Sequence, residues 1–483
     1  MAKSKTQHRD QPARATPRSV LHQQLLLLIL IVTLAFAVRA LTANFIRAHL
    51  GDPGWFPSGI YKLFDNQAQD WLDGRASIFW INDPTRTDKA IYAPGYPLWL
   101  ALIYKLSGSR SPAAVLNVQW VLDSLAVLLV VGVGVTTFGW RVGLWAGGIA
   151  ALWPLPAFYG AVPLADAPTS WIVLAATWML LLAAKRKSLG WAVGAGALIG
   201  VSCWLRANAM LLVFVWAAAI FLFTRATWQR RAILAAGMVI SGLLIISPVV
   251  LRNAITFHEF VPTGLGAGTN LLEGMGETER GNKEFGLPGS DRELIEQERT
   301  AANAPPDAQF ELYYPEGIQR DRARVRRALQ IIKQHPFWYA GTVAQRMAAV
   351  LKYAGTPSGI YGSAGINVTS RKCLSPPLQG GPIAFVVNVL GSFQSVLRYI
   401  LLPLMIIGMV WAFKWNWRAS GFIMASVFYY WVVGSVIHTH IRYGLPMHAL
   451  LTIFAGITFL KFTDFVRDRK FLSRLRRRKT TVD

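Results

Sequence analysis

Long apolar runs separated by short polar turns recur along most of this sequence. A helix needs about 20 mostly apolar residues to cross a bilayer. Ten runs are predicted to cross: 21–41, 112–138, 142–160, 168–184, 190–205, 209–224, 232–251, 384–413, 419–437 and 443–461. The predicted fold class is therefore an all-α polytopic membrane protein, a bundle of about ten transmembrane helices.

Two long segments, 42–111 and 252–380, interrupt this pattern. An odd number of predicted spans precedes each one, so both are expected on the same, outer side of the membrane. The run Tyr96–Leu106 is apolar but too short to cross, and 335–353 is amphipathic. Both are predicted to lie along the membrane surface, and a further helix is expected at 316–334.

The chain is accordingly divided into five parts. They are a cytoplasmic basic N-terminus at 1–20, a transmembrane module at 21–251 that includes the first outer loop 42–111, an outer region at 252–380, C-terminal transmembrane helices at 384–461 and a cytoplasmic basic tail at 462–483. No small-residue cleavage site follows the first apolar run, so we interpret it as an uncleaved signal anchor.

Composition and charge support this topology. The chain is 53% hydrophobic and only 15% charged, against about 25% in soluble domains. Its net charge of +24 collects at the two ends and in every second turn, and 467–479 alone carries eight basic residues and one acid. This is the positive-inside pattern, which places both termini in the cytoplasm of a cell inner (plasma) membrane and leaves no role for nucleic acid. Membrane lipid is the expected partner of the basic ends.

Two other classes find no support. The two cysteines, Cys203 and Cys373, suggest neither a disulfide framework nor a zinc site. The chain has no Walker A or Rossmann glycine pattern, so an ATP-driven pump is not indicated.

Ionisable residues at the predicted outer ends of spans are the first functional candidates, because charge beside a bilayer is costly. They include Asp65, Asp166, Arg206, Arg252 and Arg442, which the topology places on one face of the membrane. Each also has a structural interpretation. Asp65 is favoured near the start of a short helix by the helix dipole, Asp166 as an N-cap of the next span, and the arginines as side chains that reach the interface or pair with an acid.

The string Tyr92-Ala93-Pro94-Gly95-Tyr96-Pro97 is the most distinctive in the chain. Two prolines around Gly-Tyr predict a rigid turn at the membrane surface, which leads into the interfacial helix. A second polar group, at 270–279, contains Asn270, Glu273, Glu277 and Glu279, and we interpret it as a solvated face.

The order of these motifs resembles the GT-C superfamily of membrane glycosyltransferases. The closest group is the bacterial branch related to protein O-mannosyltransferases and lipid A aminoarabinose transferases, families 39 and 83. The strings that carry the resemblance are the acidic helix 61–74, Tyr92–Leu98, Tyr159–Asp166, Gly200–Arg206, Ser247–Asn253, Phe257–Pro262, His335–Phe337 and Arg442–Pro446. Two positions depart from the family pattern: Asn66 replaces the second acid of an Asp-Glu pair, and Ala93 replaces a proline.

The resemblance implies an inverting glycosyltransferase, a hexosyl- or pentosyltransferase that takes its sugar from a polyprenyl-phosphate-linked donor. The acceptor is a hydroxyl of a lipid, a glycan or a protein. Asp65 is expected to be the general base, and Asp166 to orient the acceptor or to hold, with Asp65, a divalent cation (Mg²⁺ or Mn²⁺). The resemblance also implies a donor-phosphate set and a substrate loop. These are Lys89, Arg206, Arg252 and Arg442, and Tyr92, Pro94, Gly95, Tyr96 and Pro97, respectively.

Two other classes of function stay open at this point. A transporter or lipid-linked-sugar flippase would need charges near the bilayer midplane, broken helices and internal repeats. A non-catalytic scaffold would leave Asp65 and Asp166 far apart, facing lipid or water.

Overall fold

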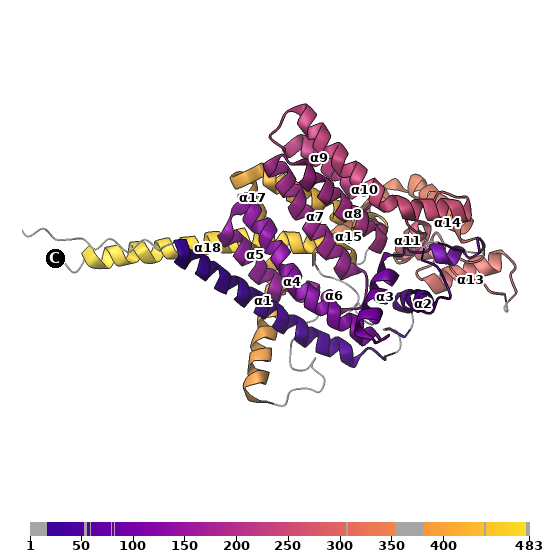
Figure 1. Ribbon diagram of the computed structural model, residues 1–483, viewed down its shortest axis with the longest axis horizontal. Coiled ribbons are helices and arrows are strands. Elements are labelled where there is room, and N and C mark those ends of the chain that lie inside the picture. Colours follow the sequence, from indigo (N-terminus) through magenta and orange to yellow (C-terminus); the bar gives the residue numbers. More distant parts are fainter. Residues whose placement is uncertain are drawn as a thin grey trace, which may run out of the picture.

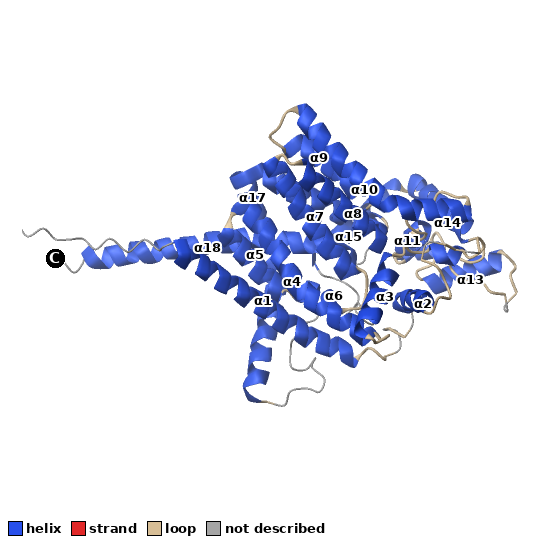
Figure 2. Cartoon of the chain, viewed as in Figure 1, coloured by secondary structure: helices blue, strands red, loops and turns tan. Residues whose placement is uncertain are grey.

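The computed structural model describes residues 17–52, 56–57, 59–78, 80–81, 83–305, 308–352, 380–438 and 441–479. Most of the basic N-terminus and Cys373 lie outside these ranges. Within them all regular secondary structure is helical, as the sequence predicts (Figure 2).

All ten predicted spans are helical in the structure. The bundle consists of α1 (Pro17–Ala48), α4 (Pro112–Phe138), α5 (Trp140–Leu152), α6 (Pro154–Ala161), α7 (Asp166–Arg186), α8 (Leu189–Leu205), α9 (Leu212–Phe223), α10 (Trp228–Phe257), α17 (Gly381–Val436) and α18 (Leu445–Lys479). The protein is a multi-pass membrane protein.

The number of spans differs from the prediction. Six described helices are long and apolar enough to cross a membrane, and a seventh is obtained if α5 and α6, bent by 60°, form one span. The difference has two sources. Helices α8 and α9 have only 17 and 12 residues, and α17 contains two predicted spans, which meet at a kink where Asn416 leaves helical geometry.

Small residues allow the bundle helices to approach closely. Helix α8 packs against α10 through Gly196 and Gly200. A Cβ on Gly196 would lie 1.9 Å from the carbonyl oxygen of Met238, so no larger residue fits there. Without a hydrophobic driving force inside lipid, such backbone contact is a main source of helix association.

A buried ion pair stabilises the bend between α5 and α6. Arg39 of α1 donates from Nε to Asp123 of α4 at 2.7 Å, and both side chains are almost completely buried. The same guanidinium donates to the carbonyls of Ala150 and Ala151, at 3.3 and 2.9 Å. Pro154 has no N–H, so the carbonyl of Ala150 loses its helical partner, and Arg39 replaces it.

The outer segments form a helical layer at one end of the bundle. The first contains α2 (Ile60–Leu72), η1 (Thr87–Ala90) and α3 (Gly95–Ser107), and the second contains α11 (Ala267–Gly276), α12 (Glu279–Lys283), α13 (Asp291–Ala301), α14 (Gly317–Gln334) and α15 (Pro336–Lys352). The helices predicted at 96–106, 316–334 and 335–353 are confirmed within a residue or two. Figure 1 shows α2, α3, α11, α13 and α14 opposite the C-terminal end of α18; we call their end the outer end of the bundle.

The two outer segments bind each other through backbone groups. Thr87 of η1 donates from its hydroxyl to the carbonyl of Tyr313 at 2.6 Å and accepts from the N–H of Gly317 at 3.0 Å. The N–H of Leu265 donates to the carbonyl of Ala90 at 3.0 Å. The start of α14 is therefore held against the turn that precedes Tyr92.

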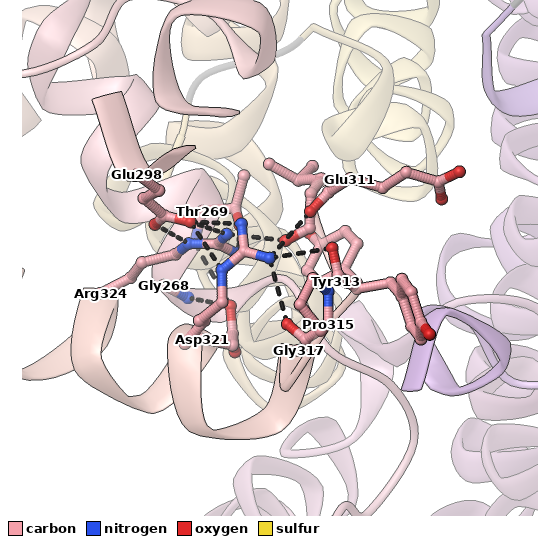
Figure 3. Close-up of polar contacts among 12 residues, drawn as sticks. Gly268, Thr269, Glu298, Glu311, Tyr313, Pro315, Gly317, Asp321 and Arg324 are labelled. Carbon is pink, nitrogen blue, oxygen red and sulfur yellow. Dashed lines mark hydrogen bonds and ion pairs between the residues drawn. The ribbon is translucent and has the colours of Figure 1, made fainter. Parts of the chain in front are cut away.

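A charged network holds the second segment together (Figure 3). Glu298 of α13 accepts hydrogen bonds from Arg320 and Arg324 of α14, and Arg324 also donates to Thr269 of α11 at 2.9 Å. Asp321 accepts from the N–H groups of Gly268 and Thr269, at the start of α11. These contacts fix α11, which carries Glu273, relative to α13 and α14.

Candidate functional site

The centre of the candidate site is a buried pair at the outer end of the bundle. Asp166 is the first residue of α7 and only 4% exposed, and it accepts a hydrogen bond from Arg206 at the end of α8. The side chain of Asp166 does not cap α7, whose N-cap residue is Ala165. The N-cap interpretation of Asp166 is therefore wrong, because the carboxylate pairs with a guanidinium from another helix.

A tyrosine joins Arg206 to Arg442, another of the predicted arginines. Tyr443 lies in η5 (Ile441–Gly444), directly before α18. The guanidinium carbons of Arg206 and Arg442 lie 4.7 and 5.4 Å from the centre of its ring. Each is within range of a cation–π interaction. Two cations from elements far apart in sequence thus converge on Tyr443, and one of them pairs with Asp166.

Tyr92, from the first outer segment, lies near this cluster. Burial raises the pKa of its hydroxyl, and its charge interactions are with Tyr443, Arg206, Arg442 and Asp291. The two arginines oppose the increase because they favour the charged form of a nearby acid. Tyr92 therefore connects the first outer segment, the arginines and the second outer segment.

Acids of the second outer segment complete the cluster. Glu273 of α11 is half-buried and interacts electrostatically with Asp291, Glu277, His438 and Arg442. Glu277 in turn contacts the imidazole of His438, with 3.1 Å between Oε1 and Nε2. The interpretation of 270–279 as a solvated face holds for the exposed Glu277 and Glu279 but is wrong for Glu273.

Glu273 is expected to make stability depend on pH. Burial, followed by repulsion from Asp291, raises its pKa from the ordinary 4.5 to about 7. A carboxyl with a raised folded-state pKa stabilises the protein fully below pH 4.5, and this contribution is lost as pH rises to about 7. Glu273→Gln is expected to reduce the loss of stability between pH 4.5 and about 7. Thermal unfolding midpoints measured in detergent over this pH range test the prediction.

Glu279→Gln is the matched control, because Glu279 is exposed and pairs only with Lys283 among the described residues. It is expected to leave the pH dependence unchanged. An equal slope in wild type and Glu273→Gln would contradict the assignment of this titration to Glu273.

The Tyr92–Pro97 string positions the end of α8. Pro94 is the N-cap of α3, and Gly95 and Pro97 form its first turn. A Cβ on Gly95 would lie 2.5 Å from the backbone carbonyl of Trp204, two residues before Arg206. The glycine is therefore required for a close backbone approach.

Tyr96 extends the string toward Asp166. Its hydroxyl donates to Oε1 of Gln119 on α4 at 3.1 Å, and Nε2 of Gln119 donates to the carbonyl of Leu164 at 3.0 Å. Leu164 stands two residues before Asp166. The string thus packs against the backbone next to Arg206 through Gly95, and it is hydrogen-bonded to the backbone next to Asp166 through Tyr96.

Gly95→Ala is expected to destabilise the protein by about 1–3 kcal/mol, because the added methyl overlaps backbone that cannot rotate away. Thermal unfolding in detergent measures the effect. Gly148→Ala on α5 is the control, since no atom lies within 4 Å of the added Cβ. Equal midpoints for the two variants would show that α3 moves freely from α8.

The carboxylate of Asp65 makes its hydrogen bonds and its ion pair within the first outer segment and not with this cluster. It is buried in the second turn of α2, not at the start, so the interpretation as an N-terminal helix charge is wrong. Its carboxylate accepts from the hydroxyl of Tyr104 on α3 at 2.8 Å, from Gln69 at 2.9 Å and from Lys62 at 3.0 Å. It is linked to the string through α3, and through Phe64, which contacts the rings of Tyr92 and Tyr96.

The two other predicted cations have few partners. Arg252 is buried near the end of α10, and it donates to Oδ1 of Asn253 at 2.8 and 3.0 Å. Within the described part of the chain, no carboxylate pairs with it. Lys89 in η1 is half-buried, and no hydrogen bond or ion pair of its side chain occurs among the described residues. Both can therefore accept an anionic ligand without first losing a carboxylate.

The structure does not supply a cation site from Asp65 and Asp166. Their carboxylates are held by separate partners, Tyr104, Gln69 and Lys62 in one case and Arg206 in the other. Among the described residues, no group of three or more His, Cys, Asp or Glu side chains is placed to hold a metal ion. The residues present thus do not fit an Mg²⁺ or Mn²⁺ ion.

Sequence reasoning assigned no role to three members of the cluster. Tyr443 stands beside the predicted Arg442, Glu273 belongs to the group interpreted as a solvated face, and Asp291 lies in a segment without recognisable spacing. An aromatic residue next to an interfacial arginine is a usable signal for Tyr443. The two acids have no such signal, since only the fold of α11 and α13 brings them to the bundle.

Part of the chain matches a known family. Residues 89–251 match the family described as dolichyl-phosphate-mannose-protein mannosyltransferase. The matched stretch is less than half of the 483 residues, but it contains Lys89, the Tyr92–Pro97 string, Asp166 and Arg206. No curated protein matches the chain.

Solved structures of similar fold come from Archaeoglobus fulgidus. The oligosaccharyltransferase AglB, in complex with an inhibitory peptide and a dolichol-phosphate, is 13% identical, and the match covers 94% of this chain and 52% of that one with a TM-score of 0.50. The apo oligosaccharyltransferase is 12% identical, with the same coverage and a TM-score of 0.52. The enzyme tethered to an acceptor peptide is 10% identical, covering 93% and 51%, with a TM-score of 0.51. The chain spans about half the length of these proteins, and the likeness is one of fold.

Proposed function

We propose that this chain, which has the fold of the GT-C superfamily of membrane glycosyltransferases, is an inverting glycosyltransferase. It transfers a hexosyl or pentosyl group from a polyprenyl-phosphate-linked donor to an acceptor hydroxyl of a lipid, a glycan or a protein. The observation that carries the proposal is the convergence of Arg206 and Arg442 on Tyr443 beside the buried Asp166.

Arginines at this level of the membrane suit a lipid-linked phosphate. The donor stays in the bilayer, so its phosphate meets the protein at the ends of the spans. Arginine binds phosphate through two parallel N–H bonds, which makes it the better partner there. Arg206, Arg252 and Arg442 would share the phosphate charge, with Lys89 as a further cation. A solved structure of the same fold contains a dolichol-phosphate, so this fold accommodates such a ligand.

The transfer itself needs one base and one leaving group. Asp65 would remove the proton of the acceptor hydroxyl, and the freed oxygen would attack the anomeric carbon of the sugar. The bond from that carbon to the phosphate oxygen breaks, and the electron pair leaves with polyprenyl phosphate. Attack from the opposite face inverts the configuration. The arginines stabilise the phosphate as it gains charge, which is the kind of preorganised electrostatic effect that lowers barriers most.

Asp166 would have an orienting role. Its pairing with Arg206 holds that guanidinium beside Tyr443. An acceptor bound near Tyr92 would lie close to this pair and to the acids Glu273 and Asp291, and its reacting hydroxyl would face Asp65, whose neighbour Phe64 contacts the ring of Tyr92. The Tyr92–Pro97 string would form the wall of the substrate site.

The topology of the proposal follows from charge. Both termini would be cytoplasmic, and the layer formed by 42–111 and 252–380 would face the periplasm or exterior. The second outer segment would cover the site from above and supply acceptor contacts.

The flippase alternative has two observations in its favour. Arg39 and Asp123 are charged residues within spans, and α5–α6 is a broken helix pair. However, the two charges satisfy each other, and Arg39 compensates the break directly. This pattern is that of a structural pair and not of a translocation path.

An assay with purified protein in proteoliposomes separates the two functions. Lipid-linked sugar profiling of a deletion strain first identifies the accumulated polyprenyl-phosphate sugar as donor. When this lipid and a membrane extract of acceptors are supplied, a transferase releases free polyprenyl phosphate. A flippase moves the lipid between leaflets but leaves the bond between sugar and phosphate intact. Movement without cleavage would overturn the proposal.

A further inference from the structure

One surface of the outer layer is both basic and apolar. On α14, residues Ile318, Arg322, Arg326, Leu329 and Lys333 recur at intervals of three and four and form a single stripe along the helix. Residues with this spacing lie on one face. Phe337, at the start of α15, follows Lys333 by four residues, across the break at His335. We call these six residues the α14 stripe.

The first part of the stripe is tied to the outer end of α10. Ile318 is buried in a cluster with Phe257 and Val261, and Phe257 is the last residue of α10. Arg322 pairs with Glu259, two residues beyond that end, at 2.8 Å. The stripe therefore faces the side of the outer layer on which the apolar span α10 ends.

The helix that follows α14 is tied to a second apolar helix. Tyr339, two residues after Phe337, donates from its hydroxyl to the carbonyl of Val436, the last residue of α17. Because α14 is tied at its start to the end of α10, and the helix that follows it is tied to the end of α17, α14 lies at the outer ends of spanning helices. Figure 1 shows α14 beside the outer end of α10.

Beyond Arg322 no described protein group covers the stripe. Arg326 and Lys333 are exposed, Leu329 is 55% exposed and Phe337 is 91% exposed. Phe260, directly after Glu259, adds a second aromatic side chain that is 70% exposed. Large apolar residues of this exposure, alternating with cations, are unfavourable in water but suit a membrane interface.

We propose that the α14 stripe docks on the anionic headgroups of the bilayer, with Leu329, Phe337 and Phe260 inserted between lipids and Arg326 and Lys333 bound to phosphate. Charge complementarity favours this occupant, because cations beside apolar side chains match a phosphate layer above acyl chains. Continuity also favours it, since the stripe extends the surface where α10 leaves the membrane. The second outer segment is thereby held close to the bilayer that carries the lipid substrates.

Photo-crosslinking with full-length protein in nanodiscs tests the apolar part. Benzoylphenylalanine at position 337 or 329 is expected to capture lipid. The same probe at Glu296, on α13 and 61% exposed, is the matched control and is expected to capture none. Capture of a second copy of the chain or of another polypeptide at 337, or equal lipid capture at 296, would overturn the proposal.

Charge reversal tests the ionic part. Arg326→Glu is compared with Arg327→Glu, an exposed neighbour that lies off the stripe. Hydrogen exchange of 322–338 is measured in nanodiscs of phosphatidylglycerol and of phosphatidylcholine. In the anionic lipid Arg326→Glu is expected to exchange at least about fivefold faster than wild type, and Arg327→Glu much less so. Equal exchange for both variants, or no dependence on lipid charge, would contradict lipid docking. Unchanged thermal midpoints would confirm that both variants fold.

Discussion

Replacing Asp65 by Asn is expected to lower sugar transfer by about 10²–10⁴-fold while the protein still folds, because a positioned general base contributes a factor of that size. The amide has the shape of the carboxylate and keeps an oxygen that can accept from Tyr104. It cannot take up a proton from an acceptor hydroxyl. Lys62 loses its partner at little cost, since its side chain is 46% exposed. The measurement is kcat with a saturating lipid-linked donor, beside a thermal unfolding midpoint.

Asp70→Asn provides the control on the same helix. Asp70 is 30% exposed and pairs with Arg75 at 2.9 Å, away from Tyr104. Its replacement is expected to leave kcat within about twofold of wild type, as for a surface ion pair. Full activity of Asp65→Asn would remove Asp65 from the mechanism. A lower thermal midpoint with unchanged kcat would assign it to the packing of α2 on α3 instead.

The largest loss of stability is expected from Asp123→Leu. Arg39 is 2% exposed, and its Nε lies 2.7 Å from Asp123. The other carboxylate oxygen accepts from Nε1 of Trp171 at 2.6 Å. Leucine leaves the guanidinium buried without a counter-charge, which costs about 3–5 kcal/mol. Chemical and thermal unfolding of the protein in detergent would measure the loss.

The double variant Arg39→Met with Asp123→Leu isolates the cause. An apolar pair replaces the charges, so the double variant is expected to be more stable than Asp123→Leu alone, although the carbonyls of Ala150 and Ala151 lose their donor. If the double variant is less stable than the single one, the unpaired charge is not the source of the loss, and the bonds to the bend between α5 and α6 matter more.

Periodicity and charge predicted the elements well and their combination less well. Helices α2, α3, α14 and α15 lie where the sequence predicts helices, and every predicted span is helical, whereas η1 was not predicted. Fewer described helices are long enough to cross alone, because an apolar run does not specify where a helix begins, ends or bends. Helices α8 and α9 are short, α5 and α6 are bent by 60°, and α17 joins two predicted spans across the kink at Asn416.

The candidate residues fared unevenly for a similar reason. Asp166, Arg206 and Arg442 meet at Tyr443, and the Tyr92–Pro97 string lies beside them. Asp65 is bound by α2 and α3, so its role in transfer remains a prediction that the Asp65→Asn variant tests. Arg39 and Asp123 did not stand out at all, because single charges within long apolar runs acquire meaning only as a pair.

The sequence by itself determined the membrane character of the chain, its helical class, the positions of its outer segments and the residue types available at their junction. These properties follow from local quantities: apolar run length, spacing and the signs of charges in turns. Tertiary structure decided which charges meet. Glu273 and Asp291 interact electrostatically with Arg442 and Tyr92 because the Glu298–Arg324 network, together with the bond from Arg346 to the carbonyl of Gly274, fixes α11 and α13 at the end of the bundle. Such contacts join residues more than 150 positions apart, and their energy depends on burial and distance, which no local pattern contains.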